Sequence, residues 1–162
     1  MKTYSISYLF LMLILLCGCR STPTDFSLFF TVESVDIYTL SLEIQKDKFY
    51  YIRQQNIYLD KNDGQEHIST SQGIMSEEDF ANLRQLIAKS SLFNLKDSYG
   101  FDQEDEKNDP LSDLVYQLTY TQGKKNKFIT LRLKPDDKYP ESLIQLIQFL
   151  SQFTSKNLVK TD

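Results

Sequence analysis

The feature that most restricts the fold is a pattern with an apolar residue at every second position, which occurs twice along the chain. In "YTLSLEIQ", which starts at Tyr38, every second residue is apolar, and "LVYQLTYT" repeats this period from Leu114. An alternation of period two predicts strands with one buried and one exposed face. "FYYIRQQNIYL" and "FITLRL" follow after short polar turns, so each alternating segment is expected to begin an antiparallel pair. A further strand is expected in the apolar run from Phe26 to Val35.

Two helices are expected, one after each strand pair. Ser76 and Asp79 have the spacing of an N-terminal helix cap, and Pro140 suits the first position of the second helix. The apolar stripes comprise Phe80, Leu83 and Ile87 in the first helix and Leu143, Leu146, Ile147, Leu150 and Phe153 in the second. The predicted fold class is therefore α+β, an antiparallel sheet with two helices packed on one face.

The two halves share one plan of strand, turn, strand and helix, which indicates a ββα–ββα pseudo-repeat. The first half contains an insertion, Asp60–Thr70, which we expect to form a hairpin because Asp63-Gly64 favours a tight turn. In this interpretation "FYYIRQQNIYL" is strand throughout. The alternative is that any two strand-strand-helix units resemble each other by period alone.

The N-terminus has the order of a secretory signal. Lys2 supplies a positive charge, and an unbroken apolar run from Leu9 to Leu16 precedes small and polar residues. This run is far shorter than the roughly 20 residues that span a bilayer, so a transmembrane anchor is not expected. The four residues from Leu16 to Cys19, "LCGC", resemble the lipobox of bacterial lipoproteins.

The resemblance to lipoproteins implies that residues 1–18 are a cleaved signal peptide, that Cys17 is lost with it, and that Cys19 carries the lipid. A disulfide between the two cysteines, or a metal site, is the alternative, although cysteines one residue apart bridge poorly. Several acyl chains on one residue give durable membrane attachment. Arg20 follows Cys19, whereas an aspartate there would resemble the inner-membrane retention signal of enteric bacteria. The expected location is the bacterial cell envelope, at the outer membrane.

Composition restricts the partners. Without Lys2, 17 basic and 22 acidic side chains remain, a net charge of −5. This balance argues against a nucleic-acid partner, which needs a basic surface, and against anionic lipid as a second anchor. We expect a lipidated tether of residues 19–27 and a single α+β domain of residues 28–158, which contains no cysteine and hence no disulfide.

Three segments are candidates for chemistry. His67 is the only histidine, and the sequence identifies no partner for it, so an ordinary surface residue is the favoured interpretation. "DKNDGQEH" from Asp60 resembles a calcium loop, but Gly64 stands where the fifth position requires a ligand, so a turn is favoured. An acidic run contains Asp102, Glu104, Asp105, Glu106 and Asp109. This run fits a solvated loop, a site for a hard cation or a contact for a basic partner.

No set of residues in the sequence indicates a particular reaction. We expect no cofactor and no zinc site, because the chain offers one histidine and no nucleotide-binding or hydrolase motif.

From about residue 36 to 153 the chain resembles a domain-of-unknown-function family of bacterial lipoproteins. The shared segments are "YTLSL", "SEEDFANLRQLIAKSSLFNLKDSYG", "VYQLTYTQGKKNKFITLRL" and "PESLIQLIQFL". Where that family has a Cys-Gly-x-Cys-Pro-like segment, this chain has "VESVDIY", and the resemblance implies no activity.

Two functions follow as hypotheses. The first is a lipid-anchored, non-catalytic binding protein of the cell envelope, whose partner is a protein or a small envelope component. An inhibitor or immunity-type protein is one variant, with the run from Asp102 to Asp109 as its contact surface. The alternative is a periplasmic carboxylate-dependent hydrolase, because the sequence does not show which acidic residues lie together in the fold. The aromatic stripes are interpreted as core residues.

Overall fold

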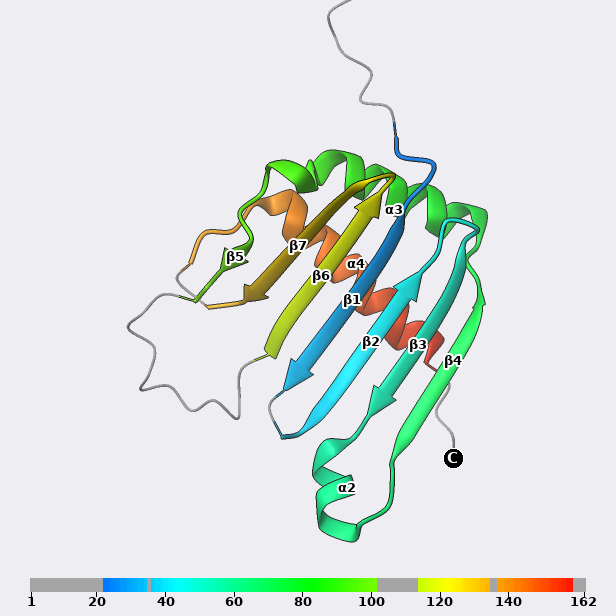
Figure 1. Cartoon of the computed structure of the whole chain (residues 1–162), viewed down its shortest axis with the longest axis vertical. Helices are drawn as coiled ribbons and strands as arrows, with labels where there is room; N and C mark the ends of the chain where they lie inside the picture. The colour runs from blue at the N-terminus through cyan, green and yellow to red at the C-terminus, as the bar shows by residue number, and fades with distance from the viewer. Residues whose placement is uncertain (1–21, 35, 102–113, 135–136, 159–162) are drawn as a thin grey trace, which may run out of the picture.

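Seven strands form one mixed sheet in the computed structural model, which describes residues 22–34, 36–101, 114–134 and 137–158. The strands are β1 (Ser27–Ser34), β2 (Tyr38–Ile44), β3 (Phe49–Gln55), β4 (Ile68–Ile74), β5 (Ser98–Tyr99), β6 (Leu114–Gln122) and β7 (Lys125–Arg132). Their order across the sheet is β4-β3-β2-β1-β6-β7-β5, so the strand that comes first in the sequence lies in the middle (Figure 1). Together with the helices, this sheet confirms the α+β class.

The expectation of a purely antiparallel sheet is wrong at one edge. β5 pairs with β7 in the parallel sense, with Tyr99 opposite Leu131. The chain leaves the 3-10 helix η1 (Leu92–Asn94) and is then held beside β7, because the Lys127 ammonium contacts the Asp97 carboxylate. The Thr130 backbone N–H also donates to the Asp97 carbonyl oxygen at 2.9 Å, so Asp97 holds the start of this short strand beside β7.

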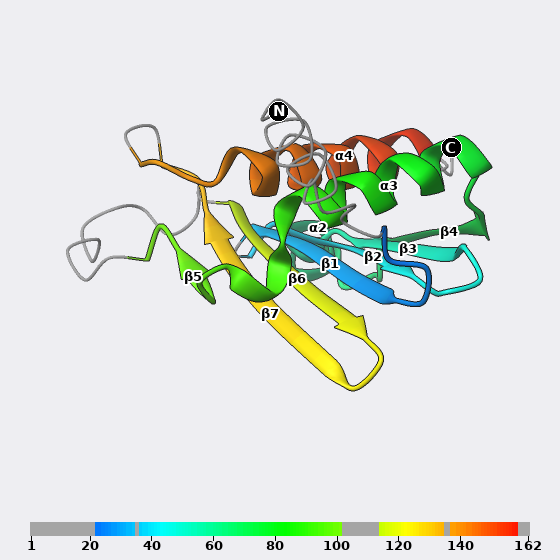
Figure 2. The same ribbon diagram turned by 90° about the horizontal axis from the view of Figure 1, so that it is seen from above.

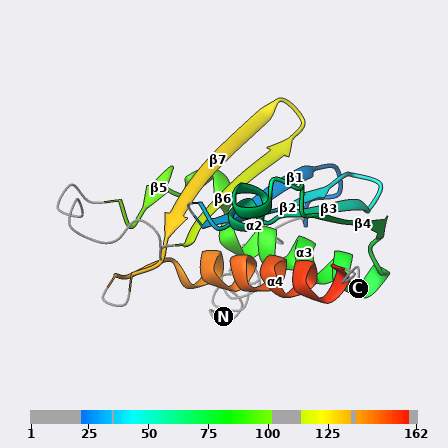
Figure 3. The same ribbon diagram turned by 90° about the horizontal axis from the view of Figure 1, so that it is seen from below.

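The helices α3 (Glu77–Ser90) and α4 (Glu141–Asn157) lie side by side over one face of the sheet (Figure 2 and Figure 3). Because successive strand residues point to opposite faces, alternate residues of the central strands meet the helices. The strands bury Leu28, Phe30, Val32, Leu42, Ile44, Ile52, Leu118, Tyr120, Ile129 and Leu131, and the helices bury Phe80, Leu83, Ile87, Leu143, Leu146, Ile147, Leu150 and Phe153. The opposite face, which we call the outer face, carries the remaining strand residues.

The predicted start of α3 is confirmed. The Ser76 hydroxyl accepts a hydrogen bond from the Asp79 backbone N–H at 3.0 Å, which satisfies one of the free donors of the first turn. Met75 and Phe80 flank this cap and are 3% and 6% exposed, as the staple-like arrangement requires. At the other end, Ser91 takes a left-handed conformation and stops the helix.

The expectation that "FYYIRQQNIYL" is strand throughout is wrong. β3 ends at Gln55, and the helix α2 (Ile57–Asp63) follows, with the Asn56 carboxamide accepting a hydrogen bond from the Leu59 N–H at 3.0 Å. Gly64, expected in a tight turn, instead ends α2 with a left-handed φ of 71°. β3 and β4 do pair antiparallel, but a helix rather than a two-residue turn connects them.

Candidate functional site

The site residues predicted from the sequence lie outside the part of the chain that the structure describes. These residues are Cys19, Asp102, Glu104, Asp105, Glu106 and Asp109. The lipidation site and the acidic contact surface therefore stay predictions. The described residues offer two other candidates, a hollow beside His67 and the outer face of the sheet.

The beginning of the described chain is held against α3. The Arg84 guanidinium donates from Nε to the Pro23 carbonyl oxygen at 2.7 Å and from Nη2 to the Thr22 hydroxyl oxygen at 2.8 Å. Packing against the domain thus begins no later than Thr22, three residues after Cys19. Three extended residues span at most about 11 Å, so a lipid on Cys19 would hold this end of the domain close to the membrane.

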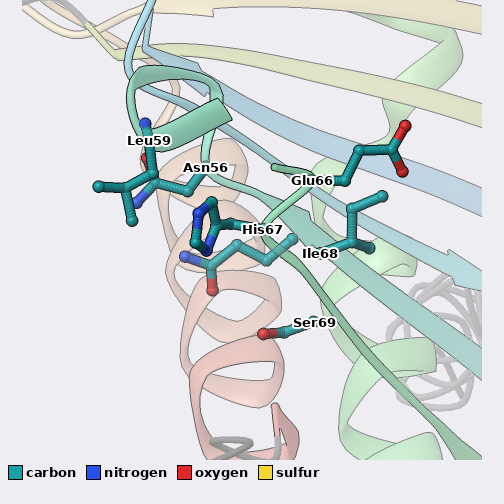
Figure 4. A pocket seen from close by; sticks show the side chains of 7 residues that line it. Asn56, Leu59, Glu66, His67, Ile68 and Ser69 are labelled. Atoms are coloured by element: carbon teal, nitrogen blue, oxygen red, sulfur yellow. The ribbon is translucent and has the colours of Figure 1, made fainter. Parts of the chain in front are cut away.

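The hollow beside His67 lies where α2 meets the start of β4 (Figure 4). Its volume is about 360 Å³, and it is lined by Gln54, Asn56, Leu59, Glu66, His67, Ile68 and Ser69. In Figure 4 the Glu66 carboxylate points away from the His67 ring. The hollow therefore does not bring this acid and this base together.

Hydrogen bonds to Asp60 and Asp63 hold the connection between β3 and β4. Asp60 accepts from the Gln55 side-chain amide at 2.9 Å and from the His67 backbone N–H at 2.6 Å. These two hydrogen bonds, the one from Gln55 first, lower the pKa of Asp60 below its usual value. The pKa of Asp63 is lowered as well, by the Gln65 backbone N–H and by the His67 ring, whose Nε2 lies 2.7 Å from the carboxylate.

This arrangement favours a structural role for the acidic residues around His67. Both oxygens of the Asp60 carboxylate already accept hydrogen bonds from the protein. The segment from Asp60 that resembles a calcium loop in sequence belongs to the helix α2 and its exit. In the described ranges no group of three or more His, Cys, Asp or Glu side chains is placed to hold a metal ion. His67 pairs with Asp63, and no described hydroxyl donates to its ring.

Replacing Asp60 with asparagine should lower the stability of the fold in a pH-dependent way. The pKa of Asp60 is lower in the folded protein than its ordinary value of 3.8. The ionised carboxylate therefore stabilises the fold at pH values above 3.8, and this contribution is lost as the pH falls through the lowered pKa. We expect the Asp60→Asn variant to melt at a lower temperature than the wild type at pH 7 and to approach it towards pH 3. Thermal melts between pH 3 and 7 measure this, and Glu66→Gln, an exposed neighbour, is the control. A pH-independent difference would contradict it.

The outer face carries three aromatic residues in one row, which we call the aromatic row. Strand pairing sets Tyr51 opposite Glu43, Glu43 opposite Phe29, Phe29 opposite Thr119, and Thr119 opposite Phe128. The aromatic residues occupy every second strand, so their backbones are about 10 Å apart. Phe29 and Phe128 are 44% and 49% exposed, large values for aromatic side chains in a sheet.

A row of hydrogen-bonding side chains lies beside the aromatic row. The strand register places Thr70, Arg53, Ser41, Thr31, Gln117 and Thr130 side by side. Within the described residues, the buried Thr31 hydroxyl has no hydrogen-bond partner. The outer face thus combines apolar rings with donors and acceptors on a framework of paired strands, which is the composition of a recognition surface.

The interpretation of the aromatic residues as core is confirmed for Phe26 and Phe30, which are buried, and is wrong for Phe29, which is exposed. A signal existed for Phe29, which stands between Leu28 and Phe30 in a strand. Since both neighbours turn inward, the residue between them has to turn outward.

No protein-family model matches the chain, and no curated protein matches it at a significant level. The resemblance to the lipoprotein family of unknown function therefore rests on the sequence pattern. None of the helices in the described ranges is both long and apolar enough to cross a bilayer.

Proposed function

We propose that this chain is a non-catalytic binding protein, held at the bacterial cell envelope by a lipid on Cys19, with the outer face of the sheet as its recognition surface. The observation that carries the proposal is the aromatic row. Phe29 and Phe128 stand exposed on strands whose other face is packed against the core, so a partner would meet them without reordering the backbone. Binding to a preorganised surface loses less conformational entropy than binding to a flexible one.

The chemistry of the outer face favours a partner with both apolar and polar groups. Aromatic side chains are over-represented among the residues that dominate binding energy, and the neighbouring row of hydroxyl, amide and guanidinium groups offers directional hydrogen bonds. Arg53 and Glu43 are both exposed there, so the face carries charges of both signs. This composition supports a protein partner, and the acidic run from Asp102 to Asp109 stays a proposed second contact for an inhibitor-like variant.

The anchor in this proposal rests on the signal-like N-terminus and on the lipobox resemblance, and Arg20 supports the outer membrane as its destination. The contacts of Arg84 with Thr22 and Pro23 add a physical reason to expect a close attachment, because they leave only a short segment between the lipid and the folded domain. A protein held in this way would meet partners that are themselves at or near the membrane surface.

A carboxylate-dependent hydrolase is the alternative, and the geometry gives it less support. The pair of His67 and Asp63 lies at an exposed helix end beside the hollow, and the Glu66 carboxylate points away from it (Figure 4). Paired carboxylates for glycoside hydrolysis need to converge on one bond from a few ångströms apart. The described acids beside the hollow do not meet this requirement.

The binding proposal is tested by photo-crosslinking in the living cell. A photoreactive phenylalanine analogue at position 29 or 128 should form adducts with the partner, while the same analogue at Tyr58, which is 59% exposed on α2, should not. Introducing Thr119→Lys between the two positions should reduce the adduct at least tenfold, about 1.4 kcal/mol, and Tyr58→Lys should leave it intact. Adducts of equal yield from all three positions, or from Tyr58 alone, would refute the outer face as the binding surface.

We also propose that the two halves of the chain share a ββα plan. The hairpins β2–β3 and β6–β7 both belong to the central sheet, and α3 and α4 follow them in sequence. β4 follows only the first hairpin, as an insertion would.

A further inference from the structure

The strand β4 leaves a row of backbone groups without a partner in the described part of the chain. β4 is the last strand of the sheet order and pairs only with β3. The hydrogen bonds from Asn56 N–H to the His67 carbonyl, 3.0 Å, and from Met75 N–H to the Lys48 carbonyl, 2.9 Å, fix which residues face β3. By the alternation of an antiparallel ladder, the residues that turn their N–H and C=O to the open edge are Ile68, Thr70, Gln72 and Ile74.

Among the described residues, this edge has none of the usual protection against pairing. Edge strands of soluble proteins are commonly very short, bulged, or interrupted by proline or charged side chains. β4 has seven residues, "ISTSQGI", without a charge or a proline, and its register with β3 is continuous. At the other end of the sheet, the edge strand β5 has only two residues. It covers only Thr130 and Leu131 of β7, and the uncovered part of β7 carries Lys125 and Lys127, the kind of charged residue that protects an edge. Among the described strands, β4 is therefore the edge without such protection.

We infer that β4 pairs antiparallel with β4 of a second copy of this chain, about a two-fold axis at Ser71. In this register Thr70 lies opposite Gln72 of the second copy, and Ile68 lies opposite Ile74 of the second copy. Every residue that turns its backbone groups outward meets another such residue, so about eight hydrogen bonds form. A two-fold interface requires this self-complementarity, which a register shifted by one residue would lose.

The side chains on the edge fit the same partner. Ile74 is 65% exposed on the outer face, where it is paired with Phe49 of β3. A second copy would place Ile68 against Ile74 and bury apolar surface at both ends of the interface. The chain has a net charge of −4, so two copies repel each other on average, and an uncharged edge is where they approach each other at the lowest electrostatic cost.

The two-fold axis is perpendicular to the sheet, so the helix layers of both copies lie on the same side. Thr22 and Pro23 are held against α3, and both chain starts therefore lie on that side as well. If Cys19 carries the lipid, as in the proposed function, both anchors of the dimer reach one membrane. The pairing itself depends only on the edge of β4.

A disulfide test addresses the register directly, with the full chain in membranes of the expressing cells and a mild oxidant. At a non-hydrogen-bonded antiparallel pair the two Cα atoms are about 4.5 Å apart, within the range for a disulfide. Ser71→Cys should therefore give a disulfide-linked dimer on a non-reducing gel. The matched variant Ser69→Cys places its two sulfurs about 14 Å apart along the strands and should give at least tenfold less dimer.

A second variant tests the hydrogen bonds of the edge. The Gln72 N–H points away from β3, so Gln72→Pro removes an edge donor and leaves the ladder to β3 intact. Added to Ser71→Cys, it should lower the dimer yield by at least about tenfold, with an unchanged melting temperature as proof of folding. No dimer from Ser71→Cys, equal dimer from Ser69→Cys, or a mixed disulfide with another protein would overturn the self-pairing.

The wild-type chain separates this inference from the lipid anchor. In the proposed lipoprotein, the lipid blocks the Cys19 thiol, and cleavage of the signal peptide removes Cys17. The wild type should therefore show no disulfide-linked dimer. A disulfide-linked dimer of the wild type would refute the lipid anchor. In that case the Ser71→Cys experiment is repeated in a chain whose Cys17 and Cys19 are replaced with serine, so that position 71 carries the only thiol.

Discussion

Replacing Phe30 with alanine should lower the free energy of unfolding by about 4 kcal/mol. Phe30 is fully buried on the central strand β1, with its ring stacked on Tyr116 at a centroid distance of 6.3 Å. The truncation leaves a cavity between the sheet and the helices that neighbours paired on both sides cannot close. Equilibrium urea unfolding of the full chain, followed by circular dichroism in one detergent, measures the loss.

Phe29 provides the matched control for this experiment, because it has the same side chain one position away on the outer face. Phe29→Ala removes a ring that is 44% exposed, and we expect a loss below about 1 kcal/mol. Equal losses for the two variants would mean that the assignment of the two faces of β1 is wrong. A large loss for Phe29 alone would mean that the outer face is covered in the folded protein.

Replacing Cys19 with alanine should abolish lipidation altogether. In the wild type, intact-mass analysis of the native protein should give a chain that begins at Cys19 and carries acyl groups. The Cys19→Ala variant should keep residues 1–18 and gain no acyl mass, because the residue that accepts the lipid is absent.

Cys17→Ala is the control, since it removes a thiol only two residues away. This variant should be processed and lipidated like the wild type. The lipoprotein assignment fails if the wild type retains Met1, if its Cys19 thiol is free, or if loss of Cys17 blocks processing as fully as loss of Cys19.

Much of the fold follows from local patterns in the sequence. Alternation locates β2 and β6, and the hydroxyl of Ser76 locates the start of α3, because both signals act over a few residues. The helix α2 was missed because its residues "IYL" favour strand, and because Asn56 and Gly64 act as caps only once the strand has ended. β5 pairs through two residues, too few for any periodicity.

The candidate surface was harder to predict than the fold. The sequence shows that Phe29, Tyr51 and Phe128 are aromatic, but only the register of β3, β2, β1, β6 and β7 brings them into one row. Register depends on contacts between residues that are far apart in the chain, which a single sequence does not reveal. The open edge of β4 depends in the same way on the order of the strands.

The central position of β1 has a consequence for how the protein is made. If the chain is exported as proposed, β1 is the first strand to leave the export machinery. One of its two neighbours, β6, lies almost ninety residues later, with Phe30 opposite Leu118. The sheet cannot close until the residues of β6 have been delivered, and pairing over such long sequence distances is itself slow. Translocation of an unfolded polypeptide and attachment of the lipid would thus precede folding, and the completed domain would assemble already tethered to its membrane.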